Sequence, residues 1–171
     1  MKRTLQGHPR LWPYAAIALL TFSAAAAEIE GVVTDVHDGD SLTLTNWQRT
    51  YKIRLTDIDA PELAQPYGRD SRTSLRELCL FKEATVQTAG EDGRERTLAR
   101  VTCVGVDANA AQVQRGWAWV FKRYAKRDSP LYAVEDEARR ARRGLWQEDA
   151  PVPPWEWRRT QPLAKPGTSP I

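Results

Sequence analysis

Charged side chains of the kinds that bind metal ions and phosphate groups gather in the stretch RLTDIDAPE, residues 54–62. It contains Arg54, Asp59 and Glu62, and Asp40 comes a short hairpin earlier. Carboxylate oxygens are the ligands that hard cations such as calcium and magnesium prefer. An arginine guanidinium can hold two phosphoryl oxygens and keeps its charge at any working pH. Together these residue types suit chemistry on a phosphate ester beside a bound cation.

Each group in such a site would have its own task. A metal polarises the phosphorus centre and organises water, and a remaining carboxylate can take a proton from that water. One electrostatic contact of this kind can be worth about 10²–10³ in rate. The same charges could also be the polar rim of a strand end, and spacing alone does not separate the two. We expect Asp57 to be a solvated strand end, and Asp38 and Gly39 to form a plain hairpin turn.

Short paired strands would bring these residues together. Alternating apolar and polar residues predict five strands, at residues 28–36, 41–45, 50–56, 84–88 and 97–104. If Thr45 faces Thr50 across the turn at residues 46–49, Asp40 lies at the Arg54 end of that hairpin. The loop at residues 59–62 begins at that same end. The sequence therefore predicts that Asp40, Asp59 and Glu62 share one rim.

Helical patterns complete the predicted architecture. Periodic apolar residues and capping signals predict three helices, at residues 69–80, 107–116 and 129–144. One helix follows the third strand and two end the domain, which favours an α+β, mainly β, fold: a five-stranded OB-type barrel with three helices. Residues 153–157, PPWEW, carry two indoles too apolar for water, so we expect an extended segment docked on the barrel.

Both ends of the chain differ from the predicted domain at residues 28–159. Residues 1–27 have a basic start, a short apolar run and an A-x-A cleavage site at Ala25–Ala27, which is typical of a secretory signal peptide. An uncleaved N-terminal anchor is the alternative. Residues 160–171 are rich in Pro and Gly, which predicts a disordered tail. We expect a periplasmic or secreted protein.

Charge composition says little about partners. Residues 1–27 hold three of the 25 Lys and Arg and none of the 22 acids, so the mature chain carries 22 of each. Residues 28–93 hold 13 acids and 7 bases, whereas residues 94–171 hold 9 acids and 15 bases. This asymmetry suits a fold with a cation-collecting end and an anion-facing surface, but charge alone favours the simpler interpretation of two solvated faces.

The two cysteines, Cys79 and Cys103, are candidates for a disulfide because export leads to an oxidising compartment. Closing a loop of about 25 residues would stabilise the fold by roughly 3 kcal/mol in the chain-entropy model. A zinc site lacks matching histidines, since His8 and His37 are the only ones and His8 lies in the signal peptide. No base is evident for a catalytic thiol.

The ordered motifs resemble those of the staphylococcal-nuclease-like (thermonuclease) family. They are DGDS at 38–41, RLTDIDAPE at 54–62, RTLARV at 96–101, GWAWV at 116–120 and ARRARRGLW at 138–146. The similarity spans roughly residues 30–147. It implies a five-stranded OB barrel with three helices, and calcium-dependent cleavage of DNA and RNA phosphodiesters that leaves 3′-phosphates.

The resemblance also implies roles for individual residues. Asp40 and Asp59 would bind Ca²⁺, joined by the backbone carbonyl of Ala60. Glu62 would lie near the ion and act as the general base that activates the attacking water. Arg54 and a second arginine would bind the phosphate and stabilise the charge on its oxygens.

The second arginine is ambiguous because this chain departs from the family pattern. The family commonly has D-x-Y-G-R before L-A, whereas this chain has EDGRER at 91–96. Counting back from L-A selects Arg96, which we prefer, and counting from the glycine selects Arg94. The tyrosine of the pattern is missing, which removes one substrate contact. Tyr124 is retained by alignment as a base-stacking residue.

The sequence therefore predicts an exported, calcium-dependent nuclease that cleaves DNA or RNA as a monomer, with no stable protein partner. A membrane would be involved only if the N-terminal segment is not cleaved. A catalytically silent OB barrel that binds nucleic acid or protein is the alternative, and a calcium-binding surface module is a third reading. Arg54, Glu62, Asp40 and Asp59 are all present, which favours the enzyme.

Overall fold

The structure, a computed structural model, describes residues 28–161. The predicted signal peptide at residues 1–27 lies outside the described residues, and so do residues 162–171 of the predicted tail. Within the part that is described, no helix combines the length and the apolar character needed to cross a membrane.

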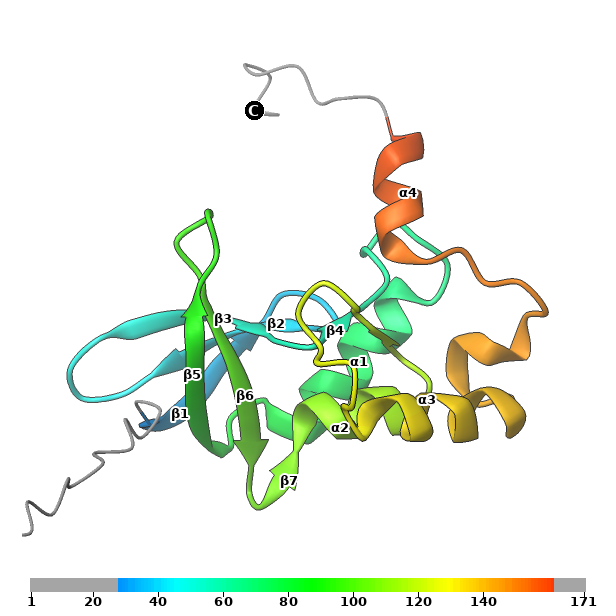
Figure 1. The fold of residues 1–171 in the computed structure, drawn as a ribbon. Helices are drawn as coiled ribbons and strands as arrows, with labels where there is room; N and C mark the ends of the chain where they lie inside the picture. Colours follow the sequence, from blue (N-terminus) through cyan, green and yellow to red (C-terminus); the bar gives the residue numbers. More distant parts are fainter. Residues whose placement is uncertain (1–27, 162–171) are drawn as a thin grey trace, which may run out of the picture.

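Five strands close into a barrel (Figure 1). They are β1 (Glu28–Val36), β2 (Ser41–Thr45), β3 (Thr50–Leu55), β5 (Glu83–Glu91) and β6 (Thr97–Cys103). Neighbours pair antiparallel in the order β3-β2-β1-β5-β6, and a parallel β3–β6 pairing closes the circle. The predicted α+β, mainly β, OB-type barrel is confirmed. Three short strands were not predicted: β4 (Ile58–Asp59), β7 (Val106–Asp107) and β8 (Trp119–Val120).

The barrel closes around the apolar side chains that alternate along its strands. Leu42 and Leu44 of β2, Ile53 of β3 and Val86 of β5 are fully buried. Burying a side chain of this size stabilises a fold by about 1.5–3 kcal/mol. The period-two pattern thus decides which face of each strand points inward, and leaves the strand ends for polar residues.

The β2–β3 hairpin has the predicted register. Thr45 pairs with Thr50, and Ser41 pairs with Arg54. One step further, the Leu55 N–H donates to the Asp40 carbonyl at 2.8 Å. Asp40 and Arg54 therefore lie at the same end of the hairpin, as the turn length predicts.

The three predicted helices are present near their expected positions. α1 (Gly68–Cys79) follows β4, and α2 (Ala108–Gln114) begins where the Asp107 carboxylate accepts the Ala110 N–H at 3.0 Å. α3 (Leu131–Arg140) is shorter than predicted, because the chain turns and continues as the 3₁₀ helix η1 (Gly144–Gln147). This turn buries Leu145 and Trp146 against the domain.

A fourth helix corrects the prediction for residues 153–157. The segment is not extended: α4 (Pro154–Thr160) starts with a proline in its first turn, where proline favours helix initiation. Its docking on the domain is as expected, since the Trp155 ring packs against Trp119 and Phe121. α4 lies beside the loop that follows β4 (Figure 1), and it runs through Thr160, one residue into the predicted tail.

The structure joins Cys79 and Cys103 in a disulfide. The bond links the end of α1 to the end of β6, across 24 positions of sequence. Both residues are buried in the main core. The end of α1 is therefore tied covalently to the end of β6.

A buried asparagine holds the barrel at its closure. Asn109 is 1% exposed, and its amide nitrogen donates to the carbonyls of Thr56 at 2.8 Å and Ala99 at 3.3 Å. Its amide oxygen accepts the Val101 N–H at 3.0 Å. One side chain of α2 thus satisfies backbone groups beyond the end of β3 and within β6.

We predict that Asn109→Ala lowers the free energy of unfolding by about 1–3 kcal/mol, because buried backbone groups lose their partners. Urea denaturation followed by circular dichroism measures the change. Gln114→Ala is the matched control, since Gln114 is an exposed amide on the same helix. Equal stability of the two variants would contradict the assigned role of Asn109.

Candidate active site

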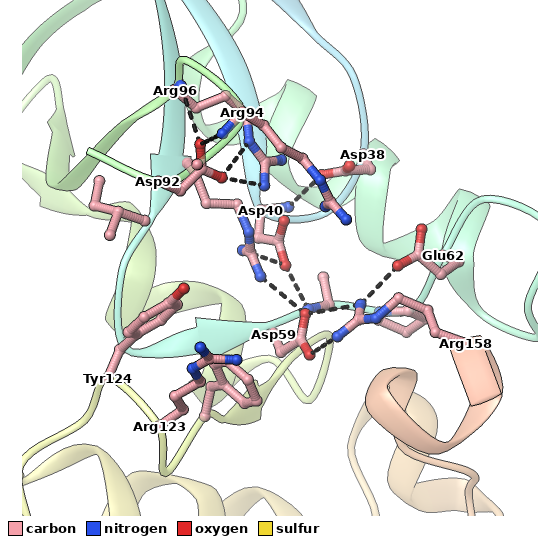
Figure 2. Close-up of a pocket in the computed structure, with 16 residues that line it drawn as sticks. Asp38, Asp40, Asp59, Glu62, Asp92, Arg94, Arg96, Arg123, Tyr124 and Arg158 are labelled. Atoms are coloured by element: carbon pink, nitrogen blue, oxygen red, sulfur yellow. Dashed lines mark hydrogen bonds and ion pairs between the residues drawn. The ribbon is translucent and has the colours of Figure 1, made fainter. Parts of the chain in front are cut away.

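A polar pocket of about 490 Å³ opens at one rim of the barrel (Figure 2). It brings together every residue predicted to be catalytic, substrate-binding or metal-binding: Arg54, Glu62, Arg96, Tyr124, Asp40, Asp59 and Ala60. Its lining includes five arginines and five acidic residues: Arg54, Arg94, Arg96, Arg123 and Arg158, with Asp38, Asp40, Asp59, Glu62 and Asp92. The pocket is therefore highly charged, with both signs in equal number.

Arg54 bridges two buried carboxylates at the floor of this pocket. Its Nη1 lies 2.6 Å from Asp40 Oδ2, and its Nη2 lies 2.8 Å from Asp59 Oδ1. The exposed fractions of the three residues are 8%, 5% and 1%. Burial lowers the pKa of Arg54, but Asp40 and Asp59 outweigh it and raise that pKa, so the guanidinium stays charged. Burial raises the pKa of Asp40 well above its ordinary value, although Arg54 opposes this.

The turn before β2 holds Asp40 in place. Asp38 Oδ1 accepts the Asp40 N–H at 3.0 Å, and Asp40 Oδ2 accepts the Ala60 N–H at 2.6 Å. Gly39 allows α1 to approach, because a Cβ there would lie 1.8 Å from Ser71 Oγ. The prediction of a plain hairpin turn is therefore incomplete: Asp38 also lines the pocket.

β4 and the loop after it place the other two carboxylates. Asp59 lies on β4, where it pairs with Trp119 of β8. Glu62 follows Pro61, and its N–H donates to Gln65 Oε1 at 3.2 Å. Its side chain is 42% exposed, so its carboxylate is open to water while that of Asp59 is buried.

Asp57 does not line the pocket. It has a left-handed backbone with φ 66° at the turn between β3 and β4, and its carbonyl accepts the Phe121 N–H at 2.8 Å. Asp57 therefore serves the turn that leads into β4, and its carboxylate is outside the site, as predicted.

The parallel pairing of β3 with β6 brings the second arginine to the pocket. Because Arg54 pairs with Leu98, the loop before β6 lies over the same rim. Arg96 is fixed there: its Nε and Nη2 donate to Asp92 Oδ2 at 2.8 and 2.6 Å. The Asp92 Oδ1 atom accepts the backbone N–H groups of Arg94 and Arg96. Burial raises the pKa of Asp92, but these hydrogen bonds outweigh it and lower that pKa.

Arg94 lines the pocket from the same loop but is exposed. Within residues 28–161, its guanidinium makes no hydrogen bond or ion pair. Arg96 is thus held by Asp92, whereas the Arg94 guanidinium has no such partner there, and the choice of Arg96 as the second arginine stays a prediction. Sequence reasoning missed Asp92, although its position four residues before Arg96 was a usable signal.

An aromatic residue and a further arginine line the opposite wall (Figure 2). The Tyr124 ring is 38% exposed and packs edge-on against Phe121, with the centroids 5.3 Å apart. Arg123 precedes it and also faces the pocket. The prediction included Tyr124 but not Arg123.

Arg158 of α4 is the site residue least accessible to sequence reasoning. Its Nη2 lies 2.7 Å from Asp59 Oδ2, and its Nη1 lies 2.7 Å from Glu62 Oε1 (Figure 2). Burial lowers the pKa of Arg158, but the hydrogen bonds to Asp59 and Glu62 outweigh it and raise that pKa. No spacing rule relates residue 158 to residues almost a hundred positions earlier.

The carboxylates suit a hard cation by their chemistry. Asp40 and Asp59 offer carboxylate oxygens at a polar pocket, and oxygen ligands are what calcium prefers. Across residues 28–161, however, no three His, Cys, Asp or Glu side chains are grouped closely enough to hold a metal ion. Arg54 and Arg158 pair with the carboxylates instead. Calcium binding by Asp40, Asp59 and Ala60 therefore stays a prediction.

An OB-type barrel with arginines and carboxylates gathered at one rim has the side-chain types suited to binding a phosphodiester. The sequence pattern of the family described as "Staphylococcal nuclease homologue" matches residues 52–148. The chain belongs to this family, as its motifs predict.

Curated relatives carry nuclease names. An "Uncharacterized endonuclease" of Escherichia coli is 38% identical over 148 residues, which cover 85% of this chain and 96% of that protein. A "Micrococcal nuclease" of Shigella flexneri is 37% identical over 155 residues, covering 85% and 89%. An "Uncharacterized endonuclease" of Haemophilus influenzae is 36% identical over 133 residues, covering 77% and 74%. The chain is therefore a nuclease, a hydrolase whose substrate is nucleic acid.

We predict that Arg96→Ala lowers kcat about 10²–10³-fold, because it removes a fixed cation aimed at the pocket. Arg94→Ala should change kcat less than about tenfold, since an exposed, unfixed side chain contributes mainly to substrate binding. Steady-state kinetics on a labelled oligonucleotide measures both, and thermal melts verify that each variant is folded. The reverse order of effects would assign the role to Arg94.

Proposed function

We propose that this protein is an exported, calcium-dependent nuclease that hydrolyses DNA and RNA phosphodiester bonds and leaves 3′-phosphate ends. The observation that carries the proposal is the bridge from Arg54 to Asp40 and Asp59, with Glu62 beside it in one pocket. A guanidinium that could hold a phosphate, two candidate metal ligands and a candidate base line the same pocket, which supports the proposal.

Arg54 and Arg96 bind the scissile phosphate in this proposal. Each guanidinium is held at the pocket by carboxylates, so its positive charge is in place before charge develops on the phosphoryl oxygens. Calcium held by Asp40, Asp59 and the Ala60 carbonyl would polarise the phosphorus centre and organise water. The pocket of about 490 Å³ leaves room for the phosphate and water together.

Glu62 acts as the general base. Its carboxylate is open to water at 42% exposure, and the contact of its backbone N–H with Gln65 holds the loop. It takes a proton from the attacking water as that water's oxygen bonds to phosphorus. The bond from phosphorus to the 5′ oxygen breaks with its electron pair on that oxygen, which takes a proton from solvent water and leaves as a 5′ hydroxyl, so the phosphate stays on the 3′ side. Arg96 stabilises the charge on the phosphoryl oxygens during this step.

Tyr124 supplies a stacking surface for a base next to the scissile bond. Its ring is supported by Phe121 and is partly exposed in the pocket wall. Stacking on an aromatic ring is tolerant of sequence and is worth about 1–3 kcal/mol per base. This supports cleavage with little base preference.

Export is supported by the character of residues 1–27 and by the disulfide between Cys79 and Cys103, since disulfides persist in oxidising compartments. We propose that the protein works in the periplasm or outside the cell. It would act as a monomer without a stable protein partner.

We predict that residues 28–171 cleave single-stranded DNA and RNA with calcium and not with chelator. Glu62→Gln and Arg54→Lys should each lower the cleavage rate by at least about 10²-fold, through loss of the base and of the bidentate phosphate contact. Glu77→Gln and Arg140→Lys are matched controls, because both residues are exposed and lie outside the pocket. Gel electrophoresis of labelled substrates, with end-group analysis of the products, gives the readout.

Two outcomes would contradict the proposed function. Cleavage that continues at full rate with chelator would exclude calcium dependence. Intact DNA and RNA in every lane, with a protein that melts cooperatively, would contradict nuclease activity. It would favour the alternative of an OB barrel that binds nucleic acid without cleaving it.

A further inference from the structure

α4 is docked onto the nuclease pocket by its aromatic face. The Trp155 ring stacks on Phe121 with the centroids 5.7 Å apart and 27° between the planes. It also packs edge-on against Trp119, and Pro154 is buried. The helix is thereby held in one place beside the pocket, although it lies beyond the residues 52–148 that match the family.

The chain leading into α4 is tied to the loop that carries Glu62. Gln65 Nε2 donates to the Val152 carbonyl at 2.5 Å, and Gln65 Oε1 accepts the Glu62 N–H at 3.2 Å. One glutamine therefore joins the candidate base loop to the approach of α4. A movement of the Glu62 loop would therefore strain its contact with the chain leading into α4, and the reverse also holds.

Arg158 projects from α4 into the space between two carboxylates (Figure 2). Its Nη2 reaches Asp59 Oδ2, and its Nη1 lies 2.7 Å from Glu62 Oε1 and 3.3 Å from Asp59 Oδ1. Asp59 is 1% exposed, so its two oxygens have little access to other partners. Arg158 covers the Asp59 oxygen that Arg54 leaves open.

The contact of Arg158 with Asp59 and Glu62 changes the net charge available to a cation at this site. In their ionised forms, the carboxylates of Asp40, Asp59 and Glu62 together with Arg54 carry two net negative charges, which one divalent cation would neutralise. With Arg158 in place only one negative charge remains. A guanidinium and a divalent cation on the same buried carboxylate would also repel each other strongly, because the effective dielectric constant there is low.

We propose that Arg158 is a built-in competitor of calcium, and that α4 is an autoinhibitory strap that holds it on Asp59 and Glu62. The inference rests on the proposed calcium site. In the strapped state the arginine neutralises a candidate ligand and engages the candidate base. Calcium binding requires its withdrawal, so the strap raises the calcium concentration at which the nuclease becomes active.

The test is the affinity of the full mature chain for calcium, measured by isothermal titration calorimetry without nucleic acid. If the strap is closed about nine-tenths of the time, removing it tightens the apparent Kd about tenfold. Arg158→Gln should show this tightening. Arg159→Gln is the matched control and should bind calcium like the wild type, because Arg159 is exposed on the same helix and outside the pocket.

Trp155→Ala provides an independent arm. It leaves Arg158 intact but removes the ring that docks α4, so it should also tighten calcium binding. Hydrogen exchange in residues 154–160 of the wild type should speed up when calcium is added, because the helix loses its anchor on the carboxylates.

The outcomes separate this inference from the proposed function. A wild type that binds calcium and cleaves, with Arg158→Gln unchanged in calcium affinity, overturns the strap alone. Weaker binding by Arg158→Gln also overturns it and makes the arginine a positioning residue for the ligands. If neither the wild type nor Arg158→Gln binds calcium, the calcium site and the strap both fail.

Discussion

The structure of this site depends on one buried interaction, the bridge from Arg54 to Asp40 and Asp59. Removing such charges from water costs several kcal/mol per ion, and the loss of one partner from a buried pair typically costs 3–5 kcal/mol. The bridge therefore requires a backbone that presents all three side chains at one point. The β2–β3 register presents Arg54 beside Asp40, and the turn into β4 adds Asp59. Site geometry and fold stability are consequently linked.

Elsewhere on the rim, arginine side chains are again held by carboxylates. Asp92 orients Arg96, and Arg158 takes the oxygens of Asp59 and Glu62 that Arg54 does not. The ion pairs at this rim can be replaced by contacts with ligands. A phosphate can replace a carboxylate as the partner of an arginine, and a metal ion can replace an arginine as the partner of a carboxylate. A nuclease needs both exchanges at one place, because its substrate is anionic and its proposed cofactor is cationic.

Rules that involve neighbouring residues were enough to predict the centre of the site. They could not predict how α4, far along the chain, docks beside it. The position of Asp40 beside Arg54 follows from turn length and the period of a strand, both of which involve neighbouring residues. The family motif then selected Arg96, which the parallel β3–β6 pairing brings to the same pocket. Arg158 could not be found in this way, because its place depends on how Trp155 packs against Phe121. The same two indoles suit an extended strand or a helix, so α4 was predicted as extended.

The most direct test of the central claim is a crystal structure with calcium and a short phosphorothioate oligonucleotide. We expect the ion to contact Asp40 and Asp59, Arg54 to contact the phosphate, and Arg158 to have left Asp59. An ion bound away from these two carboxylates, or an Arg54 that still bridges them while the nucleic acid binds elsewhere, would contradict the assignment of this rim as the active site.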